Sequence, residues 1–358
     1  MLQHSILPYA FAVSEYPVIL SIENHLSAEQ QEVFARSVVE ILGDYLYRGK
    51  VDNMNQLPSP NQLRRKIIIK ANPAKLQSKA MKDLVSICYS IKINGVDYRG
   101  LSDQFYHLNS LSEEKALEKC KHFKEEVLEH TRRQLVRIYP SCIRIASSNY
   151  SPSRLLCRFS SRSSLFKTEP FLFLLAVAFW KHGLQLLALN YQTGDKNLAA
   201  NLGLFRRNGS CGYVLKPAFL LDRAAPRMPP MTIELMVLSG QNFPRTFGLF
   251  KSPTVCPFVN IRVDDEHDVT NAQTSTICRN GLNPVWADSF TFNIKCPELA
   301  LITFTVCDSD LFNIGHDVLG VFALPIQSIA PGYRHIPLAN SHGDFLPGSS
   351  IFVKCQIS

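Results

Sequence analysis

The stretch Tyr16-Pro-Val-Ile-Leu-Ser-Ile-Glu-Asn-His25 decides how the rest of the chain is interpreted. Between Pro17 and Glu23 it is apolar apart from Ser21, which is typical of a parallel strand that is buried on both faces. Two explanations of Glu23 are open. An acid at the carboxyl end of a barrel strand points into an active site, whereas an acid in front of a helix also serves to cap that helix.

The residues after this stretch predict a helix. Ser27 and Gln30 match a capping box, and the apolar residues that follow recur at helical spacing as far as Gly43. A second buried strand is expected at Lys66–Lys70, after the proline-marked turn Leu57–Pro60. A strand, a polar loop and a helix in this order make one βα unit, so a parallel α/β fold is expected here.

Composition and charge narrow the class of protein. The 358 residues, 46% hydrophobic and 19% charged, are enough for two domains. The ten cysteines include no Cys-x-x-Cys pair and no cleavable signal precedes them, which favours reduced thiols in the cytosol. A net charge of +8 favours anionic partners. Because no nucleic-acid motif and no transmembrane segment are evident, an anionic membrane surface is the expected partner and nucleic acid is not.

A series of motifs resembles eukaryotic phosphoinositide-specific phospholipase C, most closely its delta and zeta subtypes. The opening stretch and Lys66–Lys70 resemble the end of that family's X region, and the residues from about Met231 resemble its C2 domain. Between them, five motifs resemble the Y region in the same order. They are Leu111–Ala116, Arg137–Pro140, Ser147–Tyr150, Ala188–Thr193 and Asn208–Pro217.

The resemblance implies an α/β part followed by an all-β part: the C-terminal part of a TIM-like (β/α)8 barrel and then a C2 β-sandwich. We expect the X region at 1–75, the Y region at 76–223 and the C2 domain at 231–358. Residues 153–178 are an atypical insertion, which we interpret as a product of splicing or a retained intron rather than a membrane-dipping loop. About five of the eight barrel strands are expected, with two open edges.

Periodicity places the remaining elements. A short basic linker is expected at Ala71–Lys82, and further barrel strands at Leu184–Tyr191 and Gly212–Lys216. Short alternating runs separated by turns predict a β-sandwich from Met231 onward. Its strands are expected at Thr232–Leu238, Phe258–Val263, Phe290–Ile294, Leu301–Val306, Val318–Leu324 and Ile351–Ile357.

Four residues are candidates for binding the substrate. Lys70 ends its strand where an ammonium group suits a phosphate. Arg137 and Tyr139 alternate along one strand, so a guanidinium and an aromatic ring share one face. By resemblance these three residues and Ser110 bind the inositol phosphates. Taken alone, Lys70 is also explained as a solvated strand end and Ser110 as an ordinary loop serine.

The resemblance also implies Ca²⁺ as cofactor. Glu23 matches a ligand of the catalytic Ca²⁺. In the C2 domain Cys256 and Arg279 stand where oxygen ligands are common, and a thiol and a guanidinium are poor ligands for a hard cation, so weak Ca²⁺ binding is expected. The candidate C2 ligands are Asp308, Asp310 and Asp317.

The implied activity is hydrolysis of phosphatidylinositol 4,5-bisphosphate to diacylglycerol and inositol 1,4,5-trisphosphate in intracellular signalling. The protein would be cytoplasmic and peripheral at membranes. The family's catalytic histidines lie in the first half of the X region, and His25 matches neither, so no catalytic residue is assigned. We expect this polypeptide alone to be inactive and poorly stable, as part of a full enzyme or as a truncated isoform. The alternative is a non-catalytic lipid-binding or regulatory phospholipase C-like protein.

Overall fold

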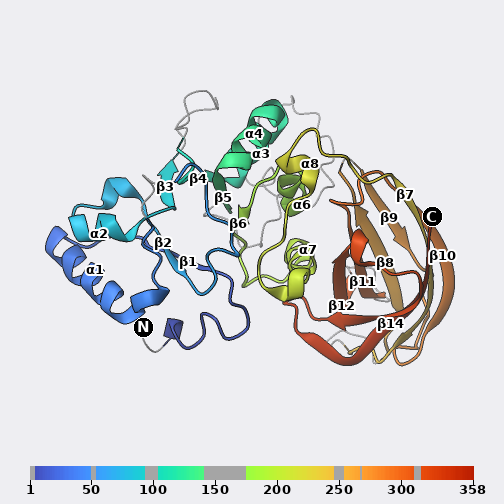
Figure 1. The fold of residues 1–358 in the computed structure, drawn as a ribbon. Coiled ribbons are helices and arrows are strands. Elements are labelled where there is room, and N and C mark those ends of the chain that lie inside the picture. Colours follow the sequence, from blue (N-terminus) through green and yellow to red (C-terminus); the bar gives the residue numbers. More distant parts are fainter. Residues whose placement is uncertain are drawn as a thin grey trace, which may run out of the picture. The chain divides into compact units, whose positions relative to one another are not determined.

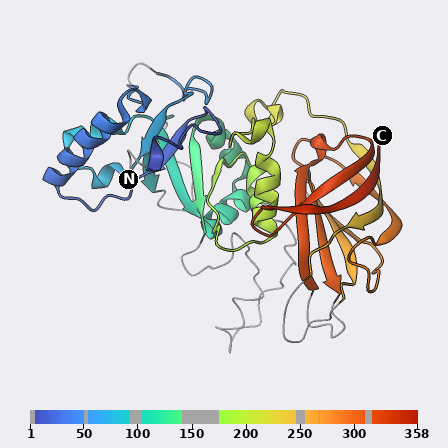
Figure 2. The same ribbon diagram turned by 90° about the horizontal axis from the view of Figure 1, so that it is seen from below.

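The computed structural model describes residues 5–49, 54–92, 104–140, 175–245, 254–266, 268–309 and 316–358. The chain divides into two compact units (Figure 1 and Figure 2). The first unit comprises Met1–Cys142, His182–Ala188 and Phe205–Lys216. The second comprises Ile143–Lys181, Leu189–Leu204 and Pro217–Ser358.

Parallel strands form the centre of the first unit. The strands β1 and β2 pair with each other, and β3, β4, β5 and β6 pair in sequence order. A bridge between Ala71 and Tyr89 joins the two sheets, and the Ser90 amide donates to the Ala71 carbonyl at 2.9 Å. The strands are β1 (Val18–Ser21), β2 (Ile67–Lys70), β3 (Tyr89–Lys92), β4 (His107–Ser112), β5 (Leu135–Tyr139) and β6 (Leu186–Leu187).

The described part of the first unit therefore holds six parallel strands in sequence order, one more than the sequence predicted. Parallel strands in sequence order with intervening helices are the arrangement of a (β/α)8 barrel. The helical elements are α1 (Ala28–Leu42), η2 (Gly43–Tyr45), η4 (Pro73–Lys75), α2 (Lys79–Leu84), α3 (Glu113–His122), α4 (Lys124–Arg133) and η5 (Asn208–Ser210).

Helix α1 begins at the predicted capping box. The Gln30 amide donates to Ser27 Oγ at 3.4 Å, and the Ser27 amide donates to Gln30 Oε1 at 3.1 Å. These two bonds satisfy two of the amides that a helix leaves unpaired at its start. The buried face of α1, including Val38 and Leu42, packs against Ile67 and other apolar residues of the first unit.

The expected basic linker Ala71–Lys82 is folded against the strand and helix that begin the chain. Asn24 Nδ2 donates to the Lys75 carbonyl at 2.8 Å, and the Gln77 amide donates to Gln31 Oε1 at 2.9 Å. The linker contains η4 and most of α2. Buried side-chain amides therefore hold this connection in place through its backbone.

One predicted strand of the first unit is wrong and another is shorter than predicted. Residues 212–216 belong to no strand, because side chains hold this segment in place of backbone pairing. The Tyr213 hydroxyl donates to the Pro17 carbonyl at 2.7 Å, and Lys216 Nζ donates to the Thr131 carbonyl at 2.7 Å. Within the predicted strand 184–191, only Leu186–Leu187 is a strand.

A hydrogen bond between β4 and α4 makes the stability of the first unit depend on pH. Asn109 Nδ2 lies 2.7 Å from His130 Nε2 and donates to Gln134 Oε1 at 3.1 Å. An amide nitrogen can donate to the imidazole only while Nε2 carries no proton. Burial, together with the nearby Lys119 ammonium, lowers the pKa of His130 to about 4.

We expect the free energy of unfolding of the first unit to fall by up to about 3 kcal/mol as the pH drops from 6.5 to about 4. Between these pH values His130 binds a proton in the unfolded chain but not in the folded chain. The contribution of neutral His130 to the free energy of unfolding is therefore complete above pH 6.5 and is lost as the pH falls to about 4. Urea titrations followed by far-ultraviolet circular dichroism measure the change. His130→Gln keeps an acceptor for Asn109 without titrating, so an equal loss in this variant would refute the assignment.

The second unit contains an antiparallel sandwich. Its sheet has the order β10-β7-β14-β13-β12-β11-β8-β9, and β12 and β13 meet at a single pair, Val321 and Ala339. The sheet therefore consists of two four-stranded halves, as in a β-sandwich. Its strands are β7 (Met231–Gln241), β8 (Pro257–Asp264), β9 (Val269–Gln273), β10 (Val285–Ile294), β11 (Leu301–Ser309), β12 (His316–Pro325), β13 (Gly332–Ala339) and β14 (Phe345–Ile357).

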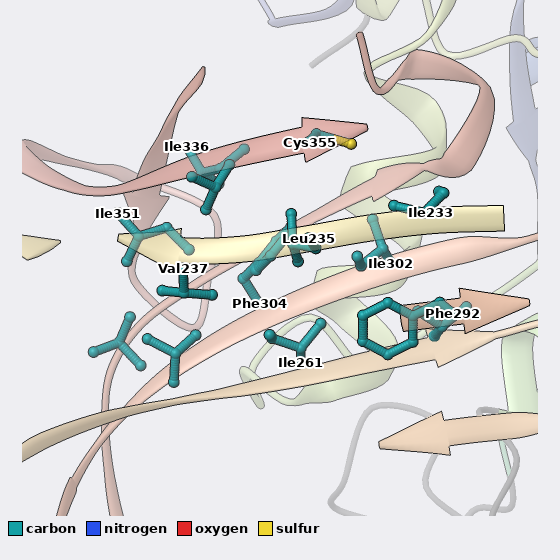
Figure 3. Close-up of a cluster of buried hydrophobic side chains, with 14 of the residues drawn as sticks. Ile233, Leu235, Val237, Ile261, Phe292, Ile302, Phe304, Ile336, Ile351 and Cys355 are labelled. Atoms are coloured by element: carbon teal, nitrogen blue, oxygen red, sulfur yellow. The ribbon is translucent and has the colours of Figure 1, made fainter. Parts of the chain in front are cut away.

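Each of the six strands predicted for the sandwich lies within an observed strand, whereas β9 and β13 were not predicted. Figure 3 shows the core of the sandwich, where side chains from β7, β8, β10, β11, β13 and β14 meet. Phe304 and Ile302 of β11 are among the buried residues of this core. This core is the main source of stability for the second unit.

Helical segments complete the second unit. They are α6 (Leu175–Trp180), α7 (Lys196–Phe205), α8 (Ala218–Leu221) and η6 (Ile326–Ser328). Val177 is 3% exposed and packs with Ala200 and Leu301. A Cβ atom on Gly203 would lie 2.5 Å from the Ala323 carbonyl oxygen, so α7 approaches β12 closely. Residues 175–178 of the expected insertion thus belong to a packed helix, and its residues 153–174 lie outside the described chain.

Candidate functional site

The candidate binding residues lie in three parallel strands of the first unit, β2, β4 and β5. Lys70 is the last residue of β2 and pairs with Ser21 of β1. Ser110 of β4 pairs with Arg137 of β5, and Tyr139 follows Arg137 by two residues. Since alternate residues of a strand share a face, Arg137 and Tyr139 lie on one side of β5.

Lys70 is a buried cation. The residue is 6% exposed, and its Nζ donates to Ser21 Oγ at 3.0 Å. Burial lowers the pKa of Lys70, and the positive charge of Arg137 lowers it further. The charge of Arg137 on β5 thus acts on the Lys70 ammonium of β2.

Arg137 and Tyr139 form the second part of the site. The guanidinium carbon of Arg137 lies 5.7 Å from the ring centroid of Tyr139, which is within the range of a cation–π contact. Arg137 is half-buried, and the Tyr139 ring is exposed. Ser110 Oγ lies 3.3 Å from Ser90 Oγ, so two hydroxyl groups of neighbouring strands share a hydrogen bond.

The site therefore combines two neighbouring cations with hydroxyl groups. Two cations held close together and partly removed from water gain free energy when an anion binds between them. Lys70 interacts with the hydroxyl of Ser21, the charge of Arg137 and the thiol of Cys88. Burial raises the pKa of the Cys88 thiol to about 12, so this neighbour is neutral. The arrangement suits a phosphorylated ligand.

Sequence reasoning missed Ser21 and Ser90. Both lie on the strands that carry or adjoin the predicted binding residues, and each hydroxyl contacts one of those residues. The available signal was the pairing of strands: Ser21 ends β1 as Lys70 ends β2. Without the register, a serine within an apolar run gives no indication that it faces a lysine.

The structure does not bring Glu23 into a metal-binding cluster. Its side chain is 80% exposed, and His25 Nε2 lies 3.3 Å from Glu23 Oε1. Among the described residues, no group of three His, Cys, Asp or Glu side chains is placed to hold a metal ion. A single exposed carboxylate does not make a Ca²⁺ shell, which needs six or more oxygen atoms. Glu23 as a Ca²⁺ ligand stays a prediction.

The candidate Ca²⁺ ligands of the sandwich are only partly described. Asp308 of β11 pairs with Asp317 of β12, so two carboxylates come from neighbouring strands. Asp308 is buried, and its Oδ1 accepts a hydrogen bond from the Cys256 amide at 2.8 Å. Asp310 lies outside the described residues. Because one oxygen of Asp308 is already bonded, these groups fit a Ca²⁺ shell poorly, and weak binding stays a prediction.

Family models match the chain in three places. The model described as "Phosphatidylinositol-specific phospholipase C, X domain" matches residues 2–73. The model of the Y domain of the same family matches residues 81–158 and 174–219. The C2 domain model matches residues 231–338. Within the described part of the chain, no helix is long and apolar enough to span a bilayer.

Curated relatives match nearly the whole chain. Human inactive phospholipase C-like protein 1 is 30% identical, with 98% of this chain and 34% of the relative covered. Human 1-phosphatidylinositol 4,5-bisphosphate phosphodiesterase delta-1 is 33% identical, with 99% and 51% covered. The chain thus spans about a third to a half of the length of these relatives.

A solved structure of a phospholipase C also matches the whole chain. The crystal structure of L. pealei PLC21 matches with a TM-score of 0.78 and 28% identity, over 100% of this chain and 47% of that chain. It joins the α/β part and the C2 sandwich in one similar protein. The chain belongs to the phosphatidylinositol-specific phospholipase C family.

Proposed function

We propose that the chain binds the headgroup of phosphatidylinositol 4,5-bisphosphate and forms part of a phospholipase C that hydrolyses this lipid to diacylglycerol and inositol 1,4,5-trisphosphate. The observation that supports the proposal best is the convergence of Lys70 and Arg137, two cations from separate strands. The protein would work in the cytoplasm, at the surface of an anionic membrane.

Each site residue has a distinct role in the proposal. Lys70 contributes a compact positive charge, whereas Arg137 can donate two parallel hydrogen bonds to one phosphate. Ser110 donates a further hydrogen bond. The exposed ring of Tyr139 packs against the apolar face of the inositol ring and keeps the Arg137 guanidinium in place.

The described residues support binding more directly than bond cleavage. Cleavage in this family requires a proton acceptor and a proton donor at the reacting phosphate. The described side chains of the site are cations and hydroxyl groups, which suit phosphate binding. The one imidazole described beside Glu23 is that of His25, and it is exposed. We therefore expect residues 1–358 alone to bind the lipid without hydrolysing it, and we assign no step to Ca²⁺.

The second candidate is a non-catalytic protein that binds phosphoinositides or regulates their turnover. The relatives support both candidates, since one is named an inactive phospholipase C-like protein and another a phosphodiesterase. Identities of 30% and 33% do not separate them. Sequencing of full-length transcripts would separate the two candidates, because it would show whether the family's catalytic histidines are encoded together with this chain.

The proposal is tested with residues 1–358 and two assays. In the first, sedimentation with vesicles compares phosphatidylinositol 4,5-bisphosphate with phosphatidylserine at equal surface charge. In the second, release of labelled inositol trisphosphate is measured with Ca²⁺, and a delta-1 enzyme serves as the active control. We expect preferential binding and no release. Equal binding to both vesicles would refute headgroup recognition, and release would refute the assignment of this chain to binding alone.

A further inference from the structure

Two cysteines of the sandwich that are distant in the sequence lie side by side. Cys256 immediately precedes β8, and Cys278 lies in the connection between β9 and β10. The amide of Arg279, the residue after Cys278, donates a hydrogen bond to Cys256 Sγ. Cys256 is buried, whereas Cys278 is exposed. The Cys278 thiol is therefore open to reagents in solution, whereas the Cys256 thiol is shielded from them.

Backbone contacts on both sides fix this pair. The Ile277 amide donates to the Pro257 carbonyl at 3.0 Å, and the Arg279 amide donates to Cys256 Sγ at 3.3 Å. The segments that carry the two cysteines thus run next to each other, as adjacent strands do. A disulfide requires Cα atoms about 4.4–6.8 Å apart, a separation that neighbouring segments provide.

Further contacts hold Cys256 on its other side. Its amide donates to Asp308 Oδ1 at 2.8 Å, and its carbonyl accepts from the Ser309 amide at 3.0 Å. Gly281 lies against Val255, where an added Cβ would be 2.9 Å from the Val255 Cβ. The site is therefore built into the packing of the sandwich and does not depend on the chance approach of two surface loops.

We propose that Cys256 and Cys278 form a reversible disulfide when the protein meets a peroxide. Hydrogen peroxide oxidises the exposed Cys278 thiolate to a sulfenic acid and releases hydroxide. The Cys256 sulfur then attacks the sulfenic sulfur, the S–O bond breaks, and water leaves after proton transfer. Overall, the two thiols lose two hydrogen atoms, and one peroxide becomes two water molecules. A dithiol reverses the reaction by exchange.

The environment of Cys256 agrees with this order of steps. Cys278 is exposed and Cys256 is buried, so a peroxide in solution reaches Cys278 first and Cys256 acts as the resolving thiol. The disulfide would tie the connection between β9 and β10, with its exposed Leu282, to the start of β8.

The test maps all ten cysteines of the folded 358-residue chain. After treatment with hydrogen peroxide, free thiols are alkylated, and the chain is digested without reduction for mass spectrometry. We expect one dominant linked peptide pair, containing Cys256 and Cys278, that dithiothreitol releases. Trypsin cleavage after Arg279 in the folded protein should also slow severalfold, since the bond restrains that segment.

Two variants make the test specific. Cys278→Ser removes the exposed thiol and should leave Cys256 reduced and free to alkylate after denaturation. Cys211→Ser removes a half-buried cysteine of the first unit and should keep the link. Accumulation of Cys278 sulfinic acid with Cys256 still free would overturn the proposal. So would links of Cys256 or Cys278 to other cysteines at comparable yield.

Discussion

Replacing both Lys70 and Arg137 with methionine is expected to weaken binding of inositol 1,4,5-trisphosphate by about 100-fold or more. A hydrogen bond to a charged group contributes about 1.5–3 kcal/mol, and each 1.4 kcal/mol corresponds to about tenfold in affinity. Each single variant should therefore lose about 10-fold to 100-fold. Isothermal titration calorimetry with the soluble headgroup measures these losses without a contribution from the membrane.

A matched control comes from the same strand region. Lys66 directly precedes β2, and its Nζ donates to the Asp44 carbonyl at 2.6 Å, at the opposite end of β2 from Lys70. Lys66→Met removes the same charge and should change the affinity less than about twofold, since exposed charges are screened. If Lys66→Met lost as much as Lys70→Met, net charge would explain the binding and the proposed site would be wrong.

The single variants also separate binding from folding. Methionine keeps most of the length and apolar surface of the lysine side chain. Burial already disfavours the Lys70 ammonium, as its lowered pKa shows, so the variant should fold as well as the original. Circular dichroism spectra that coincide with those of the original chain would confirm that any loss of affinity arises at the site.

Short sequence patterns correctly predicted the helices and strands whose formation depends on residues close together in the sequence. The capping box of Ser27 and Gln30 is visible as a spacing of three residues and is present in α1. The alternating strands of the sandwich were found for the same reason. In contrast, β9 is mostly polar and β13 contains Pro337, so neither shows a clear alternation.

Features that depend on tertiary contacts were not predictable. The sequence of 212–216 matches a strand, but the hydroxyl of Tyr213 bonds to a carbonyl near the start of the chain, and no pattern in one sequence reports such a contact. The same limit applies to the cysteines. Spacing showed no Cys-x-x-Cys pair, whereas folding brings Cys256 to Cys278.

The candidate site was predicted in part, because two kinds of information were combined. Position at a strand end suggested Lys70, and alternation suggested that Arg137 and Tyr139 share a face. The structure adds that Lys70 is buried and electrostatically coupled to Arg137. Burial of a lysine follows from packing across several strands and cannot be read from the strand that carries it.

Replacing Phe304 with alanine is expected to destabilise the second unit by about 3–5 kcal/mol, because a buried phenylalanine leaves a cavity as well as losing apolar contacts. Phe304 of β11 is 1% exposed and pairs with Ile261 of β8 and Phe322 of β12. Figure 3 shows Phe304 and Ile261 in the core. Both tryptophans of the chain, Trp180 and Trp286, belong to this unit. Tryptophan fluorescence during urea unfolding therefore reports on the second unit even if the first unfolds separately.

Phe345→Ala makes the same chemical change at a residue that is 59% exposed, and its cost should stay below about 1 kcal/mol. Because Phe345 lies in β14 of the same sandwich, the two variants share the unit, the probe and the unfolding transition. Equal losses in both variants would mean that the core around Phe304 does not hold the sandwich together. A loss confined to Phe304→Ala would show that the two halves of the sheet depend on β11 for their packing, since Phe304 belongs to a core formed by strands of both halves.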